Sequence, residues 1–454
     1  MKRDLKISRR DAGARGFTQG WGISRRGAGA RGCAERVFNG GYLPVSGWLG
    51  VLVCLVLWFT GATAAEIFVK PGSQINTIQK ALAVAKNGDV IRVGKGCYLL
   101  EDLVIEKSVT LIGDNYPVLD GQSKSNVLII RAKNVTVRGF VIRNSGIANI
   151  KDKAGIRIER ADNVHIINNK LENTCFGIYL SKVNGGMIIG NSIVGQNDAV
   201  HSGNGIHLWY SHNISIINNT VRAQRDGIYF EFATFCDIKG NLCENNFRYG
   251  LHFMFSHNDN YTFNTFRNNG SGVAVMYTKH IRMLNNTFEQ NWGSSAFGLL
   301  LKDISQSYIG HNTFSKNTSG IYMEGTTDIT MEKNSFFNNG LAVRMLANCE
   351  KDTFLRNNFM GNTFDFTTNG TENRNYLNGN YWDKYNGYDL NRDHFGDIPY
   401  RPVSLYSQLI ERLPAAIFML HSFMAELLDK AERAMPSMSY VNILDDHPSM
   451  HVNR

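Results

Sequence analysis

Methionine and histidine side chains gather in one stretch of the sequence, and their types favour binding of a soft metal ion. Met254 and Met276 stand 22 residues apart, and His252 and His257 flank the first of them. Thioether and imidazole groups suit copper, above all Cu(I), better than calcium, magnesium or zinc. Any one of these histidines alone is as readily a solvated surface ring. The prediction of a metal site therefore rests on the cluster of four.

Acidic side chains support a second hypothesis, a secreted protein that binds or degrades polysaccharide. Hydrolysis needs a pair of acids close together on neighbouring strands, and the best available set is Asp226, Glu231 and Asp303. Asp226 and Glu231 could meet, but no acid stands in the same positions of the intervening coils that begin at Gly250 and Gly272. A β-elimination reaction would instead use basic groups, but the candidates are scattered: Arg248, Lys279 and Lys302.

Neither set is convincing, so we expect no enzymatic activity and assign no catalytic or cofactor-binding residue. Two aromatic residues expected on the surface, Trp209 and Tyr229, leave a non-catalytic sugar-binding module open. The sequence also lacks the phosphate-binding, zinc-protease and serine-hydrolase motifs.

A repeat of about 22 residues predicts the elements that position these side chains. A glycine followed by an alternating apolar triplet recurs at Gly155, Gly177, Gly205, Gly227, Gly250, Gly272, Gly298 and Gly320. An asparagine stands fourteen residues after each glycine, at Asn169, Asn191, Asn219, Asn241, Asn264, Asn286, Asn312 and Asn334. This regularity indicates stacked structural units.

Units this short cannot bury their own apolar face, so they must stack into a solenoid. The alternating triplets indicate strands, and the asparagine amides can hydrogen-bond from one coil to the next. An aromatic column would stack inside, formed by Phe266, Phe288, Phe314 and Phe336. We predict an all-β fold, a right-handed parallel β-helix of roughly a dozen coils.

Position within the repeat separates outward from inward side chains. The first and third residues after each glycine are apolar and point inward, so the second and fourth point outward. This places His252, Met254 and Met276 at exposed positions on one face. Four other methionines and two cysteines of the repeat are predicted to fill the core: Met283, Met323, Met331, Met345, Cys236 and Cys243.

Three segments divide the chain. Residues 1–64 read as a secretory signal peptide, with a long basic region, an uncharged apolar run at 48–59 and small residues before the cleavage point after Ala64. This segment carries ten basic and three acidic side chains, which is seven of the nine net positive charges. The mature chain is then close to neutral, and nucleic acid is not expected as a partner.

The β-helix is predicted over residues 65–382, with a short helix at 75–85 covering its first coil. Residues 383–454 should form a C-terminal cap and an amphipathic helical tail, which can also serve as a docking surface. Residues 389–397 alternate oxygen donors as a calcium loop does, but His394 replaces the expected glycine. Calcium binding and a hydrogen-bonded cap both remain open for this loop.

Several stretches resemble the NosD family of periplasmic copper-binding accessory proteins. They read RYGLHFMFSHND at 248–259, LLLKD at 299–303, GNYW at 379–382 leading to GDIPY at 396–400, and LDKAER at 428–433. The resemblance implies a part in maturation of nitrous oxide reductase, whose catalytic centre is a copper-sulfide cluster. His394 and Phe395 depart from the Gly-rich acidic loop of relatives, which weakens the calcium hypothesis.

The resemblance also implies partners and location. The partners would be the permease and ATPase subunits of an ABC transporter, a copper chaperone lipoprotein and the nitrous oxide reductase apoprotein. The protein would be periplasmic, exported by its signal peptide and held at the membrane through the permease. Met254, Met276, His252 and His257 would be transient contacts for copper or the client protein, and the C-terminal helices would meet the permease.

Overall fold

The computed structural model describes residues 64–454, except 148–151, 197, 372–373, 421 and 436–440. Apart from Ala64, the predicted signal peptide lies outside the described residues. No helix among the described residues is long and apolar enough to cross a membrane.

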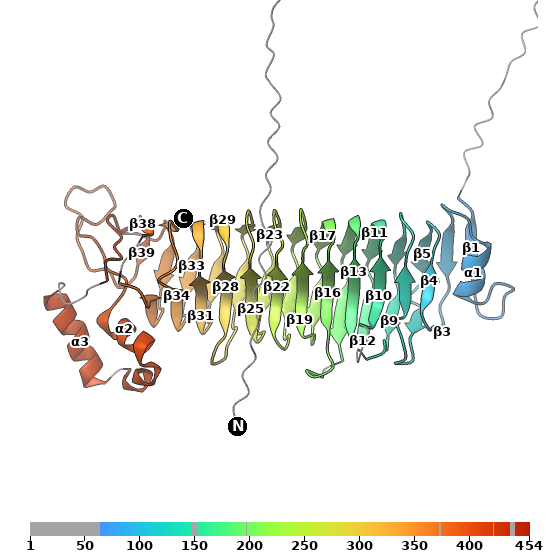
Figure 1. Ribbon diagram of the computed structural model, residues 1–454, viewed down its shortest axis with the longest axis horizontal. Helices are drawn as coiled ribbons and strands as arrows, with labels where there is room; N and C mark the ends of the chain where they lie inside the picture. The colour runs from blue at the N-terminus through green and yellow to red at the C-terminus, as the bar shows by residue number, and fades with distance from the viewer. Residues whose placement is uncertain (1–63, 148–151, 197, 372–373, 421, 436–440) are drawn as a thin grey trace, which may run out of the picture. The chain divides into compact units, whose positions relative to one another are not determined.

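Three parallel sheets form the predicted β-helix (Figure 1). Sheet A has 14 strands, from β1 (Glu66–Val69) to β38 (Tyr376–Asn378). Sheet B has 13 strands, from β3 (Cys97–Leu99) to β39 (Tyr381–Trp382). Sheet C has 12 strands, from β4 (Leu103–Ile105) to β37 (Phe364–Thr368). The chain visits the sheets in the order A, B, C, so neighbouring strands come from successive coils.

The inside of the stack contains the predicted aromatic column. The rings of Phe266, Phe288, Phe314 and Phe336 follow one another with centroids 5.5, 4.6 and 4.9 Å apart, and Phe359 and Trp382 extend the column. The four methionines and two cysteines predicted to be inward are all buried. The inward positions of the repeat were therefore predicted correctly.

The asparagine column forms a buried hydrogen-bonded ladder. In each step, the backbone N–H and the side-chain amide of one asparagine both donate to the Oδ1 of the next; for Asn264 these distances to Asn286 are both 3.0 Å. The ladder runs from Asn169 through the eight predicted positions and continues to Asn357 and Asn380. Each side-chain amide also donates to a backbone carbonyl of the preceding coil, as Asn264 does to Ile238 at 2.9 Å.

A short helix covers the first coil. Helix α1 (Ile78–Val84) begins after Thr77, whose hydroxyl accepts the N–H of Lys80, and it buries Ile78, Ala81 and Leu82 against the core. The ammonium group of Lys107 donates to carbonyls at the far end of this helix, at Leu82 and Ala85. This end of the stack is therefore closed by apolar contact and by satisfied carbonyls.

The other end is closed by the chain after Trp382. Helices α2 (Leu405–Arg412), η1 (Pro414–Met419) and α3 (Phe423–Ala434) follow the last coil. Helix α2 packs on β37, and Arg344 of β34 (Leu341–Met345) pairs with Glu411 at 2.6 Å. Beyond the helices the chain returns to the stack, where Asp445 forms a bridge with Leu377.

Asp445 terminates the asparagine ladder. Its carboxylate accepts the backbone and side-chain donors of Asn380 at 3.0 and 2.9 Å, the Trp382 indole N–H at 3.0 Å and the Gly379 N–H at 3.1 Å. This role of Asp445 could not be predicted from the sequence, because residues 383–454 carry no repeat.

In the candidate calcium loop, carboxylate oxygens accept hydrogen bonds from N–H groups of the loop's own backbone. Asp389 accepts the N–H groups of Asp393 and His394, and Asp397 accepts that of Leu390 at 2.6 Å. His394 adopts a left-handed conformation, with φ 75°. Among the described residues, no three His, Cys, Asp or Glu side chains are grouped to hold a metal ion. The geometry thus favours the hydrogen-bonded cap.

Candidate metal centre

Three of the four predicted ligands share the outer face of sheet C. His252 and Met254 lie on β22 (Tyr249–Met254), two residues apart and therefore on the same side of the strand. Met276 ends the neighbouring strand β25 (Ser271–Met276) and pairs in register with Met254. The register places Ala274, a small residue, beside His252. Two thioethers and one imidazole therefore occupy adjacent positions on two coils.

His252 is buried, so the prediction of an exposed ring was wrong. Its relative exposure is 6%, because the rings of Tyr229 and Tyr249 lie at 5.1 and 4.8 Å from it, centroid to centroid. The Nε2 atom is buried and has no hydrogen-bond partner. A buried nitrogen without a partner is costly unless something binds it. Nε2 of His252 is therefore a ring nitrogen that no protein group engages, and a ligand reaches it only if the rings beside it move.

The other ring nitrogen of His252 faces the ion pair between the buried Asp226 and the partly exposed Arg248. Its Nδ1 lies 3.3 Å from Nη2 of Arg248 and 3.8 Å from Oδ2 of Asp226. Metal-binding histidines donate the N–H of their second nitrogen to an acceptor such as a carboxylate. Here Asp226 is the carboxylate that would select this tautomer, while Arg248, which can only donate, holds Asp226 in place. Asp226 and Arg248 are thus positioning residues for the His252 ring.

Asp226 is fully buried and carries its charge. Burial acts to raise its pKa, but hydrogen bonds with His252 and Arg248 hold the pKa of Asp226 below its usual range. Nε of Arg248 donates to Oδ1 at 2.8 Å, and Nη2 donates to Oδ2. This carboxylate is therefore engaged and ionised.

Asp226 and Glu231 do not meet, which corrects the sequence-based expectation. They are the first and last residues of β19 (Asp226–Glu231), and five steps along a strand separate them by about 16 Å. The basic set is also dispersed, since Arg248 pairs with Asp226 and Lys302 pairs with Glu324 at 3.0 Å. The structure therefore brings together neither the acidic nor the basic set considered for a polysaccharide enzyme.

Met254 and Met276 are half-buried, less open than predicted. Along their row, Glu231 precedes Met254 and Lys302 follows Met276. The side chains of this row cover one another from coil to coil. The thioethers remain at the surface of the stack, where a partner or an ion can reach them.

His257 lies apart from the other three. The chain turns at Phe255 after β22 ends, and His257 then bridges Thr234 on the row that leads into sheet A. Its Nδ1 accepts the Lys279 N–H at 3.2 Å, which leaves Nε2 available. Burial, Lys279 and His280 lower the pKa of His257. The neutral imidazole, the form that binds metals, is therefore favoured, but on a different face.

An aromatic column beside the thioethers was missed by the sequence reasoning. Tyr210, Phe232, Phe255 and Tyr277, here called the aromatic corner, stack with centroids 4.5, 5.2 and 5.0 Å apart. All four have φ between 46° and 56°, a conformation that bulky residues rarely adopt. They stand five residues after the repeat glycines, where other coils have Arg160, Lys182, Asp303 and Gly325. The replacement of those residues by aromatic ones was the signal in the sequence that could have predicted this column.

The fold and this surface define a class of protein, the parallel β-helix with a patch of soft donor groups on one sheet. A family model described as periplasmic copper-binding protein (NosD) matches residues 189–387. The "Probable ABC transporter binding protein NosD" of Stutzerimonas stutzeri is 30% identical over 364 residues, which cover 76% of this chain and 83% of that protein. The chain belongs to the NosD family. Its Pseudomonas aeruginosa relative of the same name is 29% identical over 372 residues, 77% of this chain and 86% of that protein.

Solved structures share the fold. The A-module of the Azotobacter vinelandii mannuronan C-5 epimerase AlgE6 has a TM-score of 0.55 at 14% identity, covering 66% of this chain and 92% of that one. A GH87 α-1,3-glucanase catalytic unit from Streptomyces thermodiastaticus has a TM-score of 0.57 at 14% identity, covering 71% of this chain and 70% of that one. At these identities the likeness concerns the fold alone.

Proposed function

We propose that this protein is a periplasmic scaffold that holds copper transiently, as Cu(I), while the copper-sulfide centre of nitrous oxide reductase is assembled. It would act as the periplasmic component of an ABC transporter. One observation carries the proposal: the buried, unpartnered Nε2 of His252 lies on the same face as two thioethers in register. Family membership supports it, because relatives are named as ABC transporter binding proteins and the family as copper-binding.

The donor set suits the cargo. His252, Met254 and Met276 supply one imidazole and two thioethers, which soft Cu(I) prefers over the oxygen ligands of calcium or magnesium. The Asp226–Arg248 pair holds the imidazole in place. His257, which lies beyond the turn at Phe255, would contact the ion when it arrives or leaves.

The aromatic corner adds a water-poor border to this patch. Phe255 and Tyr277 directly follow Met254 and Met276 in the chain, so apolar rings replace the charged side chains that other coils carry there. Positive φ recurs at this position in the other coils, at Arg160, Lys182 and Asp303, so it is the exposed aromatic rings that mark this edge as a contact surface. The copper chaperone and the reductase apoprotein are the partners we propose for this edge.

The scaffold is proposed to have no catalysis of its own. Asp226 is buried in an ion pair, and Glu231 stands at the opposite end of the same strand. The protein would contribute binding and orientation, and the permease and ATPase subunits would carry out the energy-dependent transport.

A Cu(I) titration tests the proposal. The purified protein competes with the chromophoric chelator bicinchoninate under anaerobic conditions, and the Met254→Leu/Met276→Leu variant is compared with it. Losing two of three soft donors should weaken Cu(I) affinity by at least about tenfold. Leucine has nearly the volume of methionine, so the fold should be kept.

The control is the matched pair Met283→Leu/Met323→Leu, which changes two methionines that are buried in the core. Its Cu(I) affinity should equal that of the unchanged protein. Equal affinity in the Met254/Met276 variant would refute the site.

A further inference from the structure

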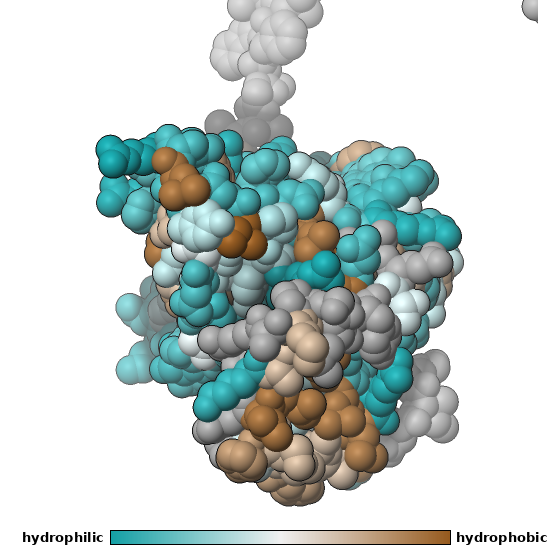
Figure 2. All heavy atoms as spheres, turned by 90° about the vertical axis from the view of Figure 1, so that its left-hand side faces the viewer, coloured by the Kyte–Doolittle hydropathy of each residue, from teal (hydrophilic) through white to brown (hydrophobic). Residues whose placement is uncertain are grey.

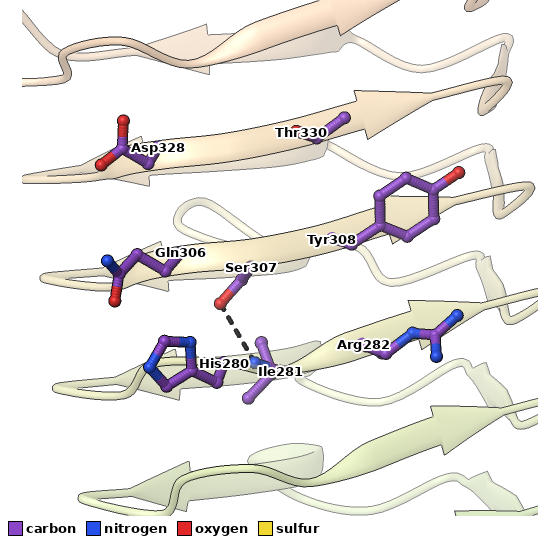
Figure 3. A pocket seen from close by; sticks show the side chains of 8 residues that line it. All are labelled: His280, Ile281, Arg282, Gln306, Ser307, Tyr308, Asp328 and Thr330. Atoms are coloured by element: carbon purple, nitrogen blue, oxygen red, sulfur yellow. Dashed lines mark hydrogen bonds between the residues drawn. The ribbon is translucent and has the colours of Figure 1, made fainter. Parts of the chain in front are cut away.

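The outer face of sheet A holds a shallow pocket of about 370 Å³, away from the copper patch. Side chains from three successive coils line it (Figure 3): His280, Ile281, Arg282, Gln306, Ser307, Tyr308, Asp328 and Thr330. The strands below it are β26 (Arg282–Leu284), β29 (Ser305–Gly310) and β32 (Thr327–Glu332). Neither the sequence reasoning nor the proposed copper function assigns these residues a role.

Tyr308 forms the floor of the pocket. A Cβ atom built on Gly310, two residues further along β29, would come within 2.6 Å of Cε1 of Tyr308. The ring therefore lies along the strand, over the space left by the glycine. Its hydroxyl donates to Oε2 of Glu332 at 2.9 Å, which fixes this orientation. Figure 3 shows the ring broadside, and Tyr308 is one of the residues that line the pocket.

Polar side chains form two parallel rows, and Tyr308 stands in the middle of one of them. Arg282 and Thr330 pair in register with Tyr308 on the preceding and following coils. Two residues earlier on each coil stand His280, Gln306 and Asp328, all with positive φ, and Figure 3 shows them in a parallel row. The rim offers both donors and acceptors of hydrogen bonds. It contains one guanidinium and one carboxylate, and Glu332 adds a second acid that holds Tyr308.

We propose that this pocket binds a neutral pyranose unit of a glycan. The face of an aromatic ring is electronegative and attracts the weakly positive C–H groups on one face of a pyranose. The flat polar groups of Gln306, Arg282 and Asp328 can hydrogen-bond to ring hydroxyls. An acidic sugar is disfavoured, because Asp328 and Glu332 offset the attraction of Arg282. An open site with one ring face should bind weakly, with a Kd of about 1 mM.

Saturation-transfer difference NMR tests this proposal on the purified protein, with cellopentaose and chitopentaose as neutral probes and trigalacturonate as the acidic probe. We expect signals from the neutral probes and a reduction of at least about fivefold in the Tyr308→Ala variant. Tyr308→Phe keeps the ring face and should retain most of the signal. Tyr376→Ala removes an exposed tyrosine elsewhere on sheet A and should change nothing.

Each other outcome overturns the proposal. Absence of signal from both neutral probes refutes sugar binding, and a signal that survives in Tyr308→Ala refutes the location. A stronger response to trigalacturonate than to the neutral probes refutes the neutral class. Circular dichroism of every variant confirms that the β-helix is intact, so a lost signal reports the pocket.

Discussion

At the residue scale, what decides the chemistry of the outer face of sheet C is burial. His207 illustrates this, because Tyr179 and Tyr229 lie at 4.5 and 4.8 Å from it, centroid to centroid. Its Nδ1 accepts the side-chain amide of Asn204 at 2.9 Å. Burial, assisted by Arg225, lowers the pKa of His207 to about 3. The folded protein therefore keeps this imidazole neutral.

This pKa predicts a specific pH dependence of stability. Between pH 6.5 and 3, His207 is protonated in the unfolded chain but neutral in the folded one, so lowering the pH favours unfolding. The contribution is about 1.4 kcal/mol per pH unit within that window. Urea denaturation of His207→Phe, which cannot titrate there, should give a flatter dependence between pH 6.5 and 4.

Other titrating groups contribute equally to the pH dependence of the unchanged protein and of His207→Phe, so they cancel when the two are compared. Burial raises the pKa of Asp259 to about 8, which makes stability fall as the pH rises from about 4 to 8. That opposite slope is present in both proteins. Parallel pH curves for the two proteins would contradict the assigned burial of His207.

At the element scale, the asparagine ladder joins ten successive coils at one corner, from Asn169 to Asn380. Asn264 donates to the Ile238 carbonyl at 2.9 Å and to Asn286, and its Oδ1 accepts two N–H groups of Asn241. Asn264→Ala removes the acceptor of the buried Asn241 backbone N–H and takes one hydrogen bond from the Asn241 amide, the Ile238 carbonyl and Asn286. We expect the free energy of unfolding to fall by about 2–4 kcal/mol, measured by urea denaturation.

The matched control is a surface asparagine in the same coil. Asn268 is exposed and has φ 50°, a conformation that glycine adopts freely. Asn268→Gly should change stability by less than about 0.5 kcal/mol. Similar losses in both variants would mean that the ladder has no special energetic role.

At the scale of the whole molecule, stability is a sum over neighbouring coils, so the ends matter. Asp445 satisfies four buried donors of the last coil. In Asp445→Ala these donors lose their acceptor, and the last coil should open locally. Hydrogen exchange should speed up at least about tenfold in β38 and β39, while β22 and β25 keep their protection. Uniformly faster exchange along the stack would contradict an end-capping role.

The helices at the same end expose an apolar surface. Phe418 and Phe423 are 91% and 77% exposed, and Leu413, Met424 and Leu427 add to the patch. Figure 2 looks at this end and shows apolar side chains gathered at its lower side, where the helices lie in Figure 1. Exposed apolar side chains gathered in this way mark a contact site.

We predict that this patch docks on the permease subunit. Phe423→Ser/Leu427→Ser should abolish co-purification with the permease and ATPase subunits, and should leave the melting temperature unchanged because both side chains are exposed. Val84→Ser, an exposed apolar residue at the other end of the stack, is the control. Normal co-purification of the helix variant would exclude this face.

The sequence by itself determined the architecture. A repeat of about 22 residues with a fixed glycine, an asparagine and alternating apolar positions is satisfied by stacked parallel strands, and every inward prediction that it made was confirmed, from Phe314 to Met323. The reason is local, since inside or outside follows from the two-residue period of a strand.

Only the tertiary structure decided how the outer face is used. Whether His252 is exposed depends on rings contributed by other coils and by its own strand, at Tyr229 and Tyr249. Whether His257 joins it depends on the corner at Phe255. The end cap depends on Asp445, which returns to Asn380 across 65 residues. These contacts join residues that no repeat period relates, so their outcome is set by packing in three dimensions.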